Sequence, residues 1–161
     1  MKEFQIVYDK NKELDAMFAK EYGNSEDIIN KNKLELIVEL GELANESRCF
    51  KYWSVKKPIK DKVLEEYADC MLMVLYFFNI LEVSLEEMFP KPKKANDILE
   101  EFTYVFNLSS RTRDEYNKDI IKEIFVNLLE LGYLLGFTNQ DIISGCLKKI
   151  EINKKRFEIE Y

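Results

Sequence analysis

Apolar side chains recur every three or four residues along most of the chain, a spacing that predicts amphipathic helices. The first predicted helix covers residues 11–20 and ends before Gly23 and Asn24, which favour a helix C-terminus. The second runs from about residue 26 to about residue 53, because Ser25 is a good N-cap and periodic apolar residues follow it. The two segments are therefore predicted to be consecutive helices joined by a short turn.

The third predicted helix begins with an N-cap at Asp61 and runs to about Glu82, after a loop that contains Pro58 and several lysines. Residues 70–81 of this helix are apolar almost all round, so we expect it to lie in the interior. The apolar run is too short to span a bilayer, and the N-terminus lacks the apolar core of a signal peptide. We therefore expect no association with a membrane.

Three more helices are predicted, over residues from about 97 to 108, between Ser110 and Gly136, and over residues 139–156. Capping and turn-forming residues mark their ends and the break that precedes them. These residues are Ser84, Pro90, Pro92, Asn96 or Asp97, Ser109, Ser110, Gly136 and Thr138. With only 5 Gly and 3 Pro in the chain, the pattern predicts an all-α fold, a bundle of about six helices.

Length and composition narrow the function. The 161 residues fit a single domain over 1–161, and a net charge of -6 does not favour nucleic acid or anionic lipid as a partner. Three separated cysteines indicate neither a disulfide framework nor a CxxC metal site, and they fit a reducing cytoplasm. The absence of histidine excludes Ser-His-Asp and Cys-His catalysis and nearly all zinc sites. Carboxylates are then the expected catalytic groups.

Four glutamates fall on one face of the second predicted helix, because they follow the spacing i, i+4, i+7, i+11. They are Glu35, Glu39, Glu42 and Glu46. Like charges at these spacings repel one another, so a partner that offsets the repulsion is expected. An isolated ExxE pair is usually a solvated acidic face, since Glu is a common helix former. The stripe alone therefore does not decide between a surface and a site.

The third predicted helix strengthens the case for a site. Glu66 and Asp69 lie three residues apart at the head of this interior helix, and no Lys or Arg follows within the next turns to pair with them. Two carboxylate pairs on packed helices would form an oxygen cage suited to Mg²⁺. Such sites bind phosphate esters, which makes phosphoanhydride hydrolysis the leading reaction class. A di-iron carboxylate bundle needs Glu-x-x-His, and the chain has no His.

The segment ELGELANESRCFKYWS at residues 39–54 resembles a motif of the dimeric dUTPases, a group within the all-α NTP pyrophosphatase (MazG-like) superfamily. In that motif an ExxE metal pair is followed by Asn-Glu and by an aromatic FKxW segment. The sequence EEYAD at residues 65–69 resembles the second metal pair of the family. Four C-terminal residues resemble its KxxxNxxR segment and the tyrosine that follows; they are Lys149, Asn153, Arg156 and Tyr161.

The resemblance implies a homodimeric, Mg²⁺-dependent enzyme that hydrolyses dUTP, and also dUDP, to dUMP with a water activated between carboxylates. It implies that the metal ligands are Glu39, Glu42, Glu66 and Asp69. One of the first two also serves as general base for the water, and Glu46 supports the ligands. Trp53 is implied in a uracil pocket, and lysine and arginine side chains are implied at the phosphates. The substrate contacts implied are Asn11, Asp15, Lys51, Trp53, Lys149, Asn153, Arg156 and Tyr161.

Two other functions stay open at the level of the sequence. One is a MazG-like pyrophosphohydrolase that acts on another nucleotide, such as dCTP or a nucleotide with a damaged base. The other is a non-catalytic helical dimer that binds a regulatory protein or a nucleotide, although the intact ExxE and ExxD pairs argue against it. Two residues also have plainer interpretations, with Trp53 as a packing residue and Lys51 as a solvated surface lysine.

Overall fold

The computed structural model describes residues 2–88 and 97–160. Within them the chain forms six α-helices and two single turns of 3₁₀ helix, and no strand. The helices are α1 (Gln5–Tyr22), α2 (Glu26–Ser47), α3 (Lys60–Ile80), α4 (Ile98–Arg111), α5 (Lys118–Leu134) and α6 (Asn139–Glu160). The 3₁₀ turns are Lys2–Phe4 and Leu85–Glu87. The predicted all-α fold with six helices is confirmed.

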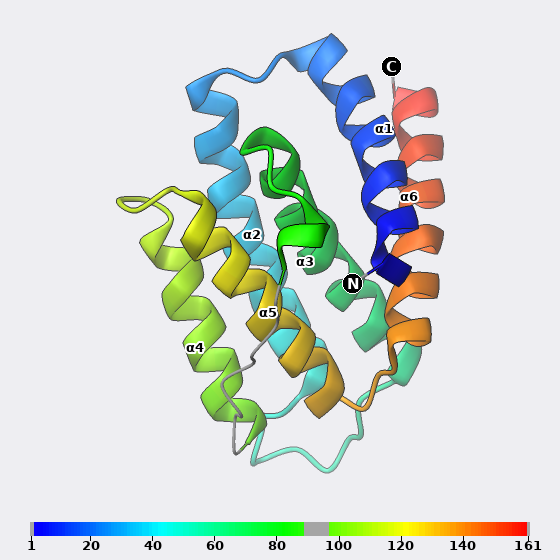
Figure 1. The fold of residues 1–161 in the computed structure, drawn as a ribbon. Helices are drawn as coiled ribbons and strands as arrows, with labels where there is room; N and C mark the ends of the chain where they lie inside the picture. Colours follow the sequence, from blue (N-terminus) through cyan, green and yellow to red (C-terminus); the bar gives the residue numbers. More distant parts are fainter. Residues whose placement is uncertain (1, 89–96, 161) are drawn as a thin grey trace.

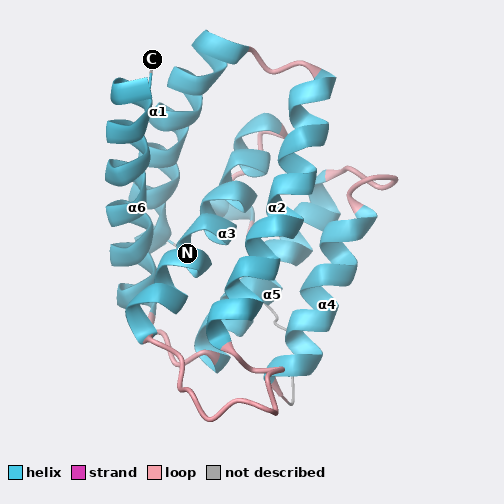
Figure 2. Cartoon of the chain, turned by 180° about the vertical axis from the view of Figure 1, so that it is seen from behind, coloured by secondary structure: helices cyan, strands magenta, loops and turns pink. Residues whose placement is uncertain are grey.

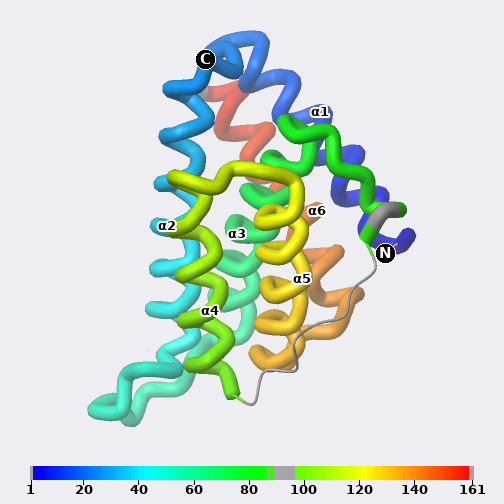
Figure 3. Tube along the Cα trace, turned by 60° about the vertical axis from the view of Figure 1, so that its left-hand side comes forward, coloured from blue at the N-terminus to red at the C-terminus, as the bar shows by residue number. Residues whose placement is uncertain are grey.

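Helix α3 runs through the centre of the bundle (Figure 1) and packs against α1, α2, α5 and α6. Helices α1 and α6 lie side by side on one flank of α3, and α4 and α5 lie on the other flank, as the view from behind also shows (Figure 2). The tube view places α2 next to α4 at the edge of the molecule (Figure 3). Helices α2 and α3 are joined by the loop 48–59 and run antiparallel, so the C-terminus of α2 lies near the N-terminus of α3.

The caps predicted from the sequence form in three places. Ser25 accepts a hydrogen bond from a backbone N–H of the first turn of α2, and Asp97 accepts two at the start of α4. At α6, Thr138 and Asp141 bond reciprocally, each accepting from the backbone N–H of the other. Gly136 ends the preceding helix with φ of +87°, a conformation that favours glycine. Local capping chemistry was therefore enough to place these helix ends.

Helix α2 ends six residues earlier than predicted, at Ser47 instead of about Trp53. Arg48 takes the left-handed conformation with φ of +59°, and its guanidinium donates to the backbone carbonyl of Lys56 and to the hydroxyl of Ser54. These bonds turn the chain into the loop 48–59. They join residues six and eight apart, so apolar periodicity gave no sign of them.

Three further boundaries were predicted wrongly. Helix α3 begins at Lys60, so Asp61 is not its N-cap but lies in its first turn. Helix α4 continues through Ser109 and Ser110, because Ser109 is buried in the packing between helices. Helix α1 starts at Gln5, well before residue 11, because the apolar stripe extends back along the chain to Phe4. The predicted breaks at Pro90, Pro92 and Asn96 lie outside the described residues.

The interior position predicted for the third helix is confirmed, since α3 buries most of residues 70–78. Tyr67 of this helix is fully buried and donates a hydrogen bond of 2.8 Å to the carbonyl of Leu128 on α5. The close approach of the two helices needs Gly132, where an added Cβ would lie 2.6 Å from the Tyr67 hydroxyl. None of the described helices is both long enough and apolar enough to cross a membrane.

Candidate active site

Helices α2 and α3 present two matching stripes of side chains to the same region. Both stripes have the spacing i, i+3, i+7, i+10, which keeps residues on one helix face. The stripes are Asn32, Glu35, Glu39 and Glu42 on α2, and Glu66, Asp69, Met73 and Tyr76 on α3. Because the helices are antiparallel, the carboxylates of both stripes meet at one end and Asn32 and Tyr76 lie toward the other.

Three of the four predicted metal ligands form a compact cluster. Carboxylate oxygens of Glu39, Glu42 and Glu66 all lie within 4.8 Å of one another. Burial, and then the charges of Asp69 and Glu42, raise the pKa of Glu39 to about 7, and burial together with the same two charges also raises the pKa of Glu66. Close carboxylates that resist ionisation are the hard oxygen donors that a divalent cation such as Mg²⁺ prefers, so the residues fit that ion.

The fourth predicted ligand, Asp69, is held by a lysine. Lys149 of α6 places its Nζ 2.7 Å from Asp69 Oδ2 and 3.3 Å from Glu65 Oε1, and only 7% of this lysine is exposed. Burial raises the pKa of Asp69, and the Lys149 ammonium opposes that rise. The expectation that these carboxylates have no basic partner is therefore wrong for Asp69. The partner comes from a distant helix, and the expectation took account only of neighbours along the chain.

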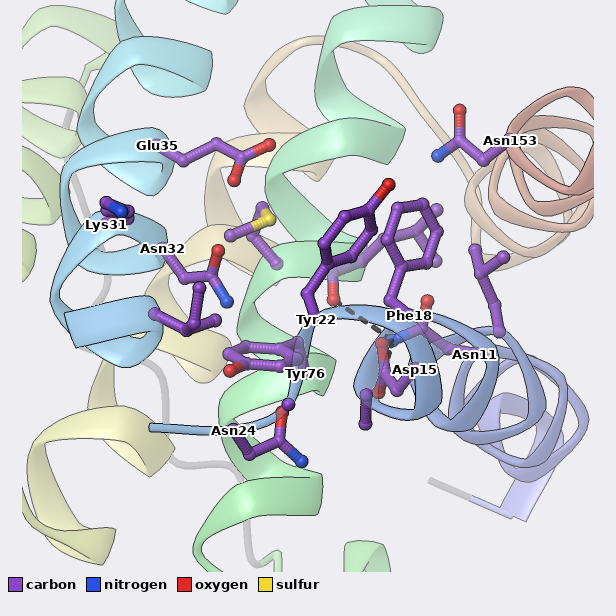
Figure 4. A pocket seen from close by; sticks show the side chains of 16 residues that line it. Asn11, Asp15, Phe18, Tyr22, Asn24, Lys31, Asn32, Glu35, Tyr76 and Asn153 are labelled. Carbon is purple, nitrogen blue, oxygen red and sulfur yellow. Dashed lines mark hydrogen bonds between the residues drawn. The ribbon is translucent and has the colours of Figure 1, made fainter. Parts of the chain in front are cut away.

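A cavity of about 370 Å³ opens beside the carboxylates, between α1, α2, α3 and α6 (Figure 4). Glu35 lines it and joins it to the cluster, because Glu35 is one turn from Glu39 and its carboxyl interacts with Asp69. Three residues that the sequence assigned to substrate also line it, namely Asn11, Asp15 and Asn153. The fold thus brings together residues from both ends of the chain next to the carboxylates.

Asp15 and Asn11 form the polar wall of this cavity. The Asn11 Nδ2 donates to the carbonyl of Leu72 at 3.2 Å and to the Asp15 carboxylate at 3.4 Å, and Asn79 also donates to Asp15 at 3.3 Å. Burial raises the pKa of Asp15 to about 7, although the Asn79 bond opposes the shift. Within the described residues, amides and not cations bond this carboxyl.

The other predicted contacts lie elsewhere. Trp53 is 64% exposed on the loop 48–59, with its ring in T-shaped contact with Tyr52 and Phe50, and it does not line the cavity. Lys51 is on the same loop, which follows the C-terminus of α2, whereas the residues of α2 that line the cavity lie in its N-terminal half. Arg156 is exposed on α6, where its charge acts on Asp69.

Glu46 lies one turn beyond Glu42 on α2 and outside the compact cluster of three carboxylates. Its position is consistent with a supporting contact, and that assignment stays a prediction. Tyr161 falls outside the described residues.

The sequence reasoning missed several residues of the cavity. Tyr76 and Asn32 line it, and both continue the carboxylate stripes by whole turns, so extending the stripes along each helix would have found them. Phe18 and Tyr22 of α1 line it too, and Figure 4 shows their rings on the α1 side of the space. Nothing local marks these two rings, because only the packing of α1 against α3 and α6 turns them inward.

Comparison with known families covers nearly the whole chain. The family model described as dUTPase matches residues 3–161, a span that includes all six helices and every side chain of the cavity and the cluster. No curated protein matches the chain. The family hydrolyses nucleoside triphosphates to monophosphates and pyrophosphate, and it generally depends on a divalent metal. On this match, and with a helical fold that agrees with it, the chain belongs to the all-α dUTPase family, whose members are the dimeric dUTPases.

Proposed function

We propose that this protein is a Mg²⁺-dependent dUTP diphosphatase that hydrolyses dUTP, and also dUDP, to dUMP. The family supports dUTP hydrolysis in general. The observation that carries the finer proposal is the cluster of Glu39, Glu42 and Glu66, with oxygens within 4.8 Å, beside a cavity of about 370 Å³. A carboxylate cage next to a cavity of this size lets the phosphates lie at the cage while the nucleoside is enclosed.

The carboxylates divide the chemistry between them. We assign Glu39, Glu42, Glu66 and Asp69 as the residues that would hold the metal, with Glu46 supporting Glu42 from the next turn. A divalent ion held there would offset charge on the attacked phosphate and would lower the pKa of a bound water. Glu39 accepts the proton of the attacking water, because its carboxylate lies in the compact cluster beside the other groups that would hold the metal.

The residues that line the cavity beside the carboxylates are assigned to the nucleoside part of the substrate. The Asp15 carboxylate and the Asn11 amide face the base edge, and Asn153 of α6 faces the sugar. Lys149 and Arg156 neutralise phosphate charge, since the positive charges of both act on Asp69, one of the residues assigned to the metal.

Three assignments rest on the family resemblance alone. They are Lys51 at the phosphates, Trp53 at the base and Tyr161 at the sugar or phosphates. Lys51 and Trp53 would reach the site only if the loop 48–59 moved or a partner subunit supplied them. The homodimeric state and a cytoplasmic location are likewise proposals. Quenching of Trp53 fluorescence by dUMP with Mg²⁺ tests its assignment, because it is the only tryptophan of the chain.

One observation favours dCTP as a second substrate. With a pKa of about 7, Asp15 exists in both protonation states near neutral pH. The ionised carboxylate accepts the N3–H of uracil, whereas the protonated acid donates to the bare N3 of cytosine and accepts from its amino group. A non-catalytic binding dimer has no comparable support, because three carboxylates held within 4.8 Å of one another repel each other when no cation is bound.

Product analysis tests the proposal. Purified protein with Mg²⁺ is offered dUTP, dUDP, dCTP, dTTP and UTP, and pyrophosphate is separated from orthophosphate. We expect dUMP and pyrophosphate from dUTP, with dUTP the fastest triphosphate. Glu39→Gln should lose at least about 100-fold in kcat, while Glu26→Gln, the same change at the exposed start of α2, should not. Orthophosphate as the only product from dUTP would rule out cleavage between the α- and β-phosphates.

A further inference from the structure

Tyr76 is an aromatic side chain at the end of the cavity away from the carboxylate cluster. It comes from α3, the helix that also carries Glu66 and Asp69, and it lines the cavity together with Asn32 of α2 and Asp15 of α1. Figure 4 shows its ring edge-on, with one face turned toward the side where Glu35 and Asn153 lie. We propose that Tyr76 is the residue on which the base of the nucleotide stacks, an inference that rests on the nucleotide-hydrolase function proposed above.

The register of the two helices supports this position. Tyr76 follows Asp69 by seven residues and Asn32 precedes Glu39 by seven, so each lies two turns beyond a carboxylate on the same face. Seven residues correspond to about 10 Å along a helix. A nucleotide with its α-phosphate at the carboxylates extends this far to its base. Its sugar then lies at the intermediate turn, where Glu35 and Met73 line the cavity.

Two other aromatic rings, Trp53 and Phe18, are less suited to this task. Trp53 is 64% exposed on the loop 48–59 and does not line the cavity. Phe18 lines the cavity but packs against Phe157 of α6, with ring centroids 4.9 Å apart. Tyr76 meets Phe77 in a T-shaped contact and not in a stack. Its position and orientation therefore favour it as the platform for a base.

The hydroxyl of Tyr76 is not needed for this role. Its oxygen is buried and makes no hydrogen bond of good geometry among the described residues, and the polar side chain that interacts with it is Asn32. Removing the hydroxyl with Tyr76→Phe leaves the ring in place and deletes a polar atom whose contact with Asn32 is weak, a change that costs the fold little. Tyr76→Leu removes the ring but keeps an apolar side chain. Comparing Tyr76→Phe with Tyr76→Leu therefore separates the contribution of ring stacking from that of filling the cavity.

Calorimetric titration of dUMP in Mg²⁺ tests the inference without turnover. We expect Tyr76→Leu to weaken dUMP binding about tenfold or more, the loss typical of one base–aromatic stack, and Tyr76→Phe to stay within about twofold of the parent protein. Trp53→Leu should weaken binding less than Tyr76→Leu does. Unchanged dUMP binding by Tyr76→Leu would overturn the inference, and so would a loss that occurs only in Trp53→Leu.

Binding of inorganic pyrophosphate, which has no base, shows whether a variant has lost only base stacking or has a damaged site. We expect Tyr76→Leu to bind pyrophosphate with Mg²⁺ within about twofold of the parent protein; loss of pyrophosphate and dUMP together would show a structural role and overturn the stacking role. The proposed function fails separately. A parent protein that binds dUMP but releases no pyrophosphate from dUTP refutes that function alone, whereas normal turnover with unchanged dUMP binding by Tyr76→Leu refutes only this inference.

Discussion

Lys149 is the residue whose role depends most on the packing of distant helices. Its ammonium lies between Asp69 and Glu65, and it is almost fully buried. In the absence of a metal ion it offsets part of the negative charge of the carboxylates. A cation bound beside Asp69 would take over this task and leave Lys149 available to substrate phosphate.

We therefore expect Lys149→Met to lower the free energy of unfolding by roughly 1–3 kcal/mol in EDTA, because a partly buried carboxylate loses its partner. Mg²⁺ should recover part of this loss, so the rise in Tm with Mg²⁺ is larger for the variant than for the parent protein. Thermal melting in EDTA and in Mg²⁺ measures both effects. Lys148→Met, at the exposed neighbouring position, is the control. Equal melting of Lys149→Met and Lys148→Met in EDTA would contradict this role.

Asp15 links stability to pH. Its pKa is raised by burial from 3.8 to about 7, so between these values the folded state keeps a proton that the unfolded chain has lost. The stabilisation is complete below pH 4 and is lost as the pH rises through 7. Relative to Asp15→Asn, which cannot ionise, the parent protein should thus be less stable at pH 8 than at pH 5. Urea unfolding at the two pH values measures the difference, and a difference that does not change with pH would contradict the assignment.

At the scale of the helices, the sequence was most informative at three N-caps whose contacts are local. The caps at Ser25, Asp97 and Thr138 involve residues two or three apart, and all three formed. The end of α2 and the continuation of α4 through Ser109 depend on contacts with distant segments, and both were missed.

The candidate site likewise has features that the sequence predicts and features that depend on the packing of distant helices. The carboxylate stripes could be read from their helical spacing, and the cluster of Glu39, Glu42 and Glu66 agrees with them. The cavity and the Lys149 contact could not be read, because they exist only where α1 and α6 pack against α3. Trp53 shows the converse: its segment carries the family resemblance, and yet the fold leaves it away from the cavity.

Two helical glycines should respond in opposite directions to substitution by alanine. At Gly132 of α5 an added Cβ would meet the buried Tyr67 hydroxyl at 2.6 Å, so Gly132→Ala should destabilise the fold by about 1–3 kcal/mol. At Gly41 of α2 an added Cβ would meet no atom within 4 Å outside the neighbouring backbone of its own helix, so Gly41→Ala should stabilise the fold by about 0.5–1 kcal/mol through helix propensity. Chemical unfolding of both variants measures the signs. A stabilised Gly132→Ala would contradict the close approach of α3 and α5 at Tyr67.

At the scale of the whole molecule, the protein is expected to be a homodimer. Apolar side chains such as Leu34 and Val38 are exposed on the outer face of α2, and the chain belongs to a family of dimeric enzymes. Sedimentation equilibrium should give twice the chain mass of 19.2 kDa at micromolar concentration. A mass of a single chain over the whole concentration range would contradict the expectation.

The central claim is that the carboxylates of α2 and α3 form a Mg²⁺ site, and thermal melting of Glu42→Gln tests it most directly. In EDTA this variant should melt at or above the parent protein, because one of several mutually repelling carboxylates is neutral. Mg²⁺ should raise the Tm of the parent protein and of Glu26→Gln but leave Glu42→Gln unchanged. A full rise in Tm with Mg²⁺ for Glu42→Gln would contradict the claim, because the ion would then bind elsewhere.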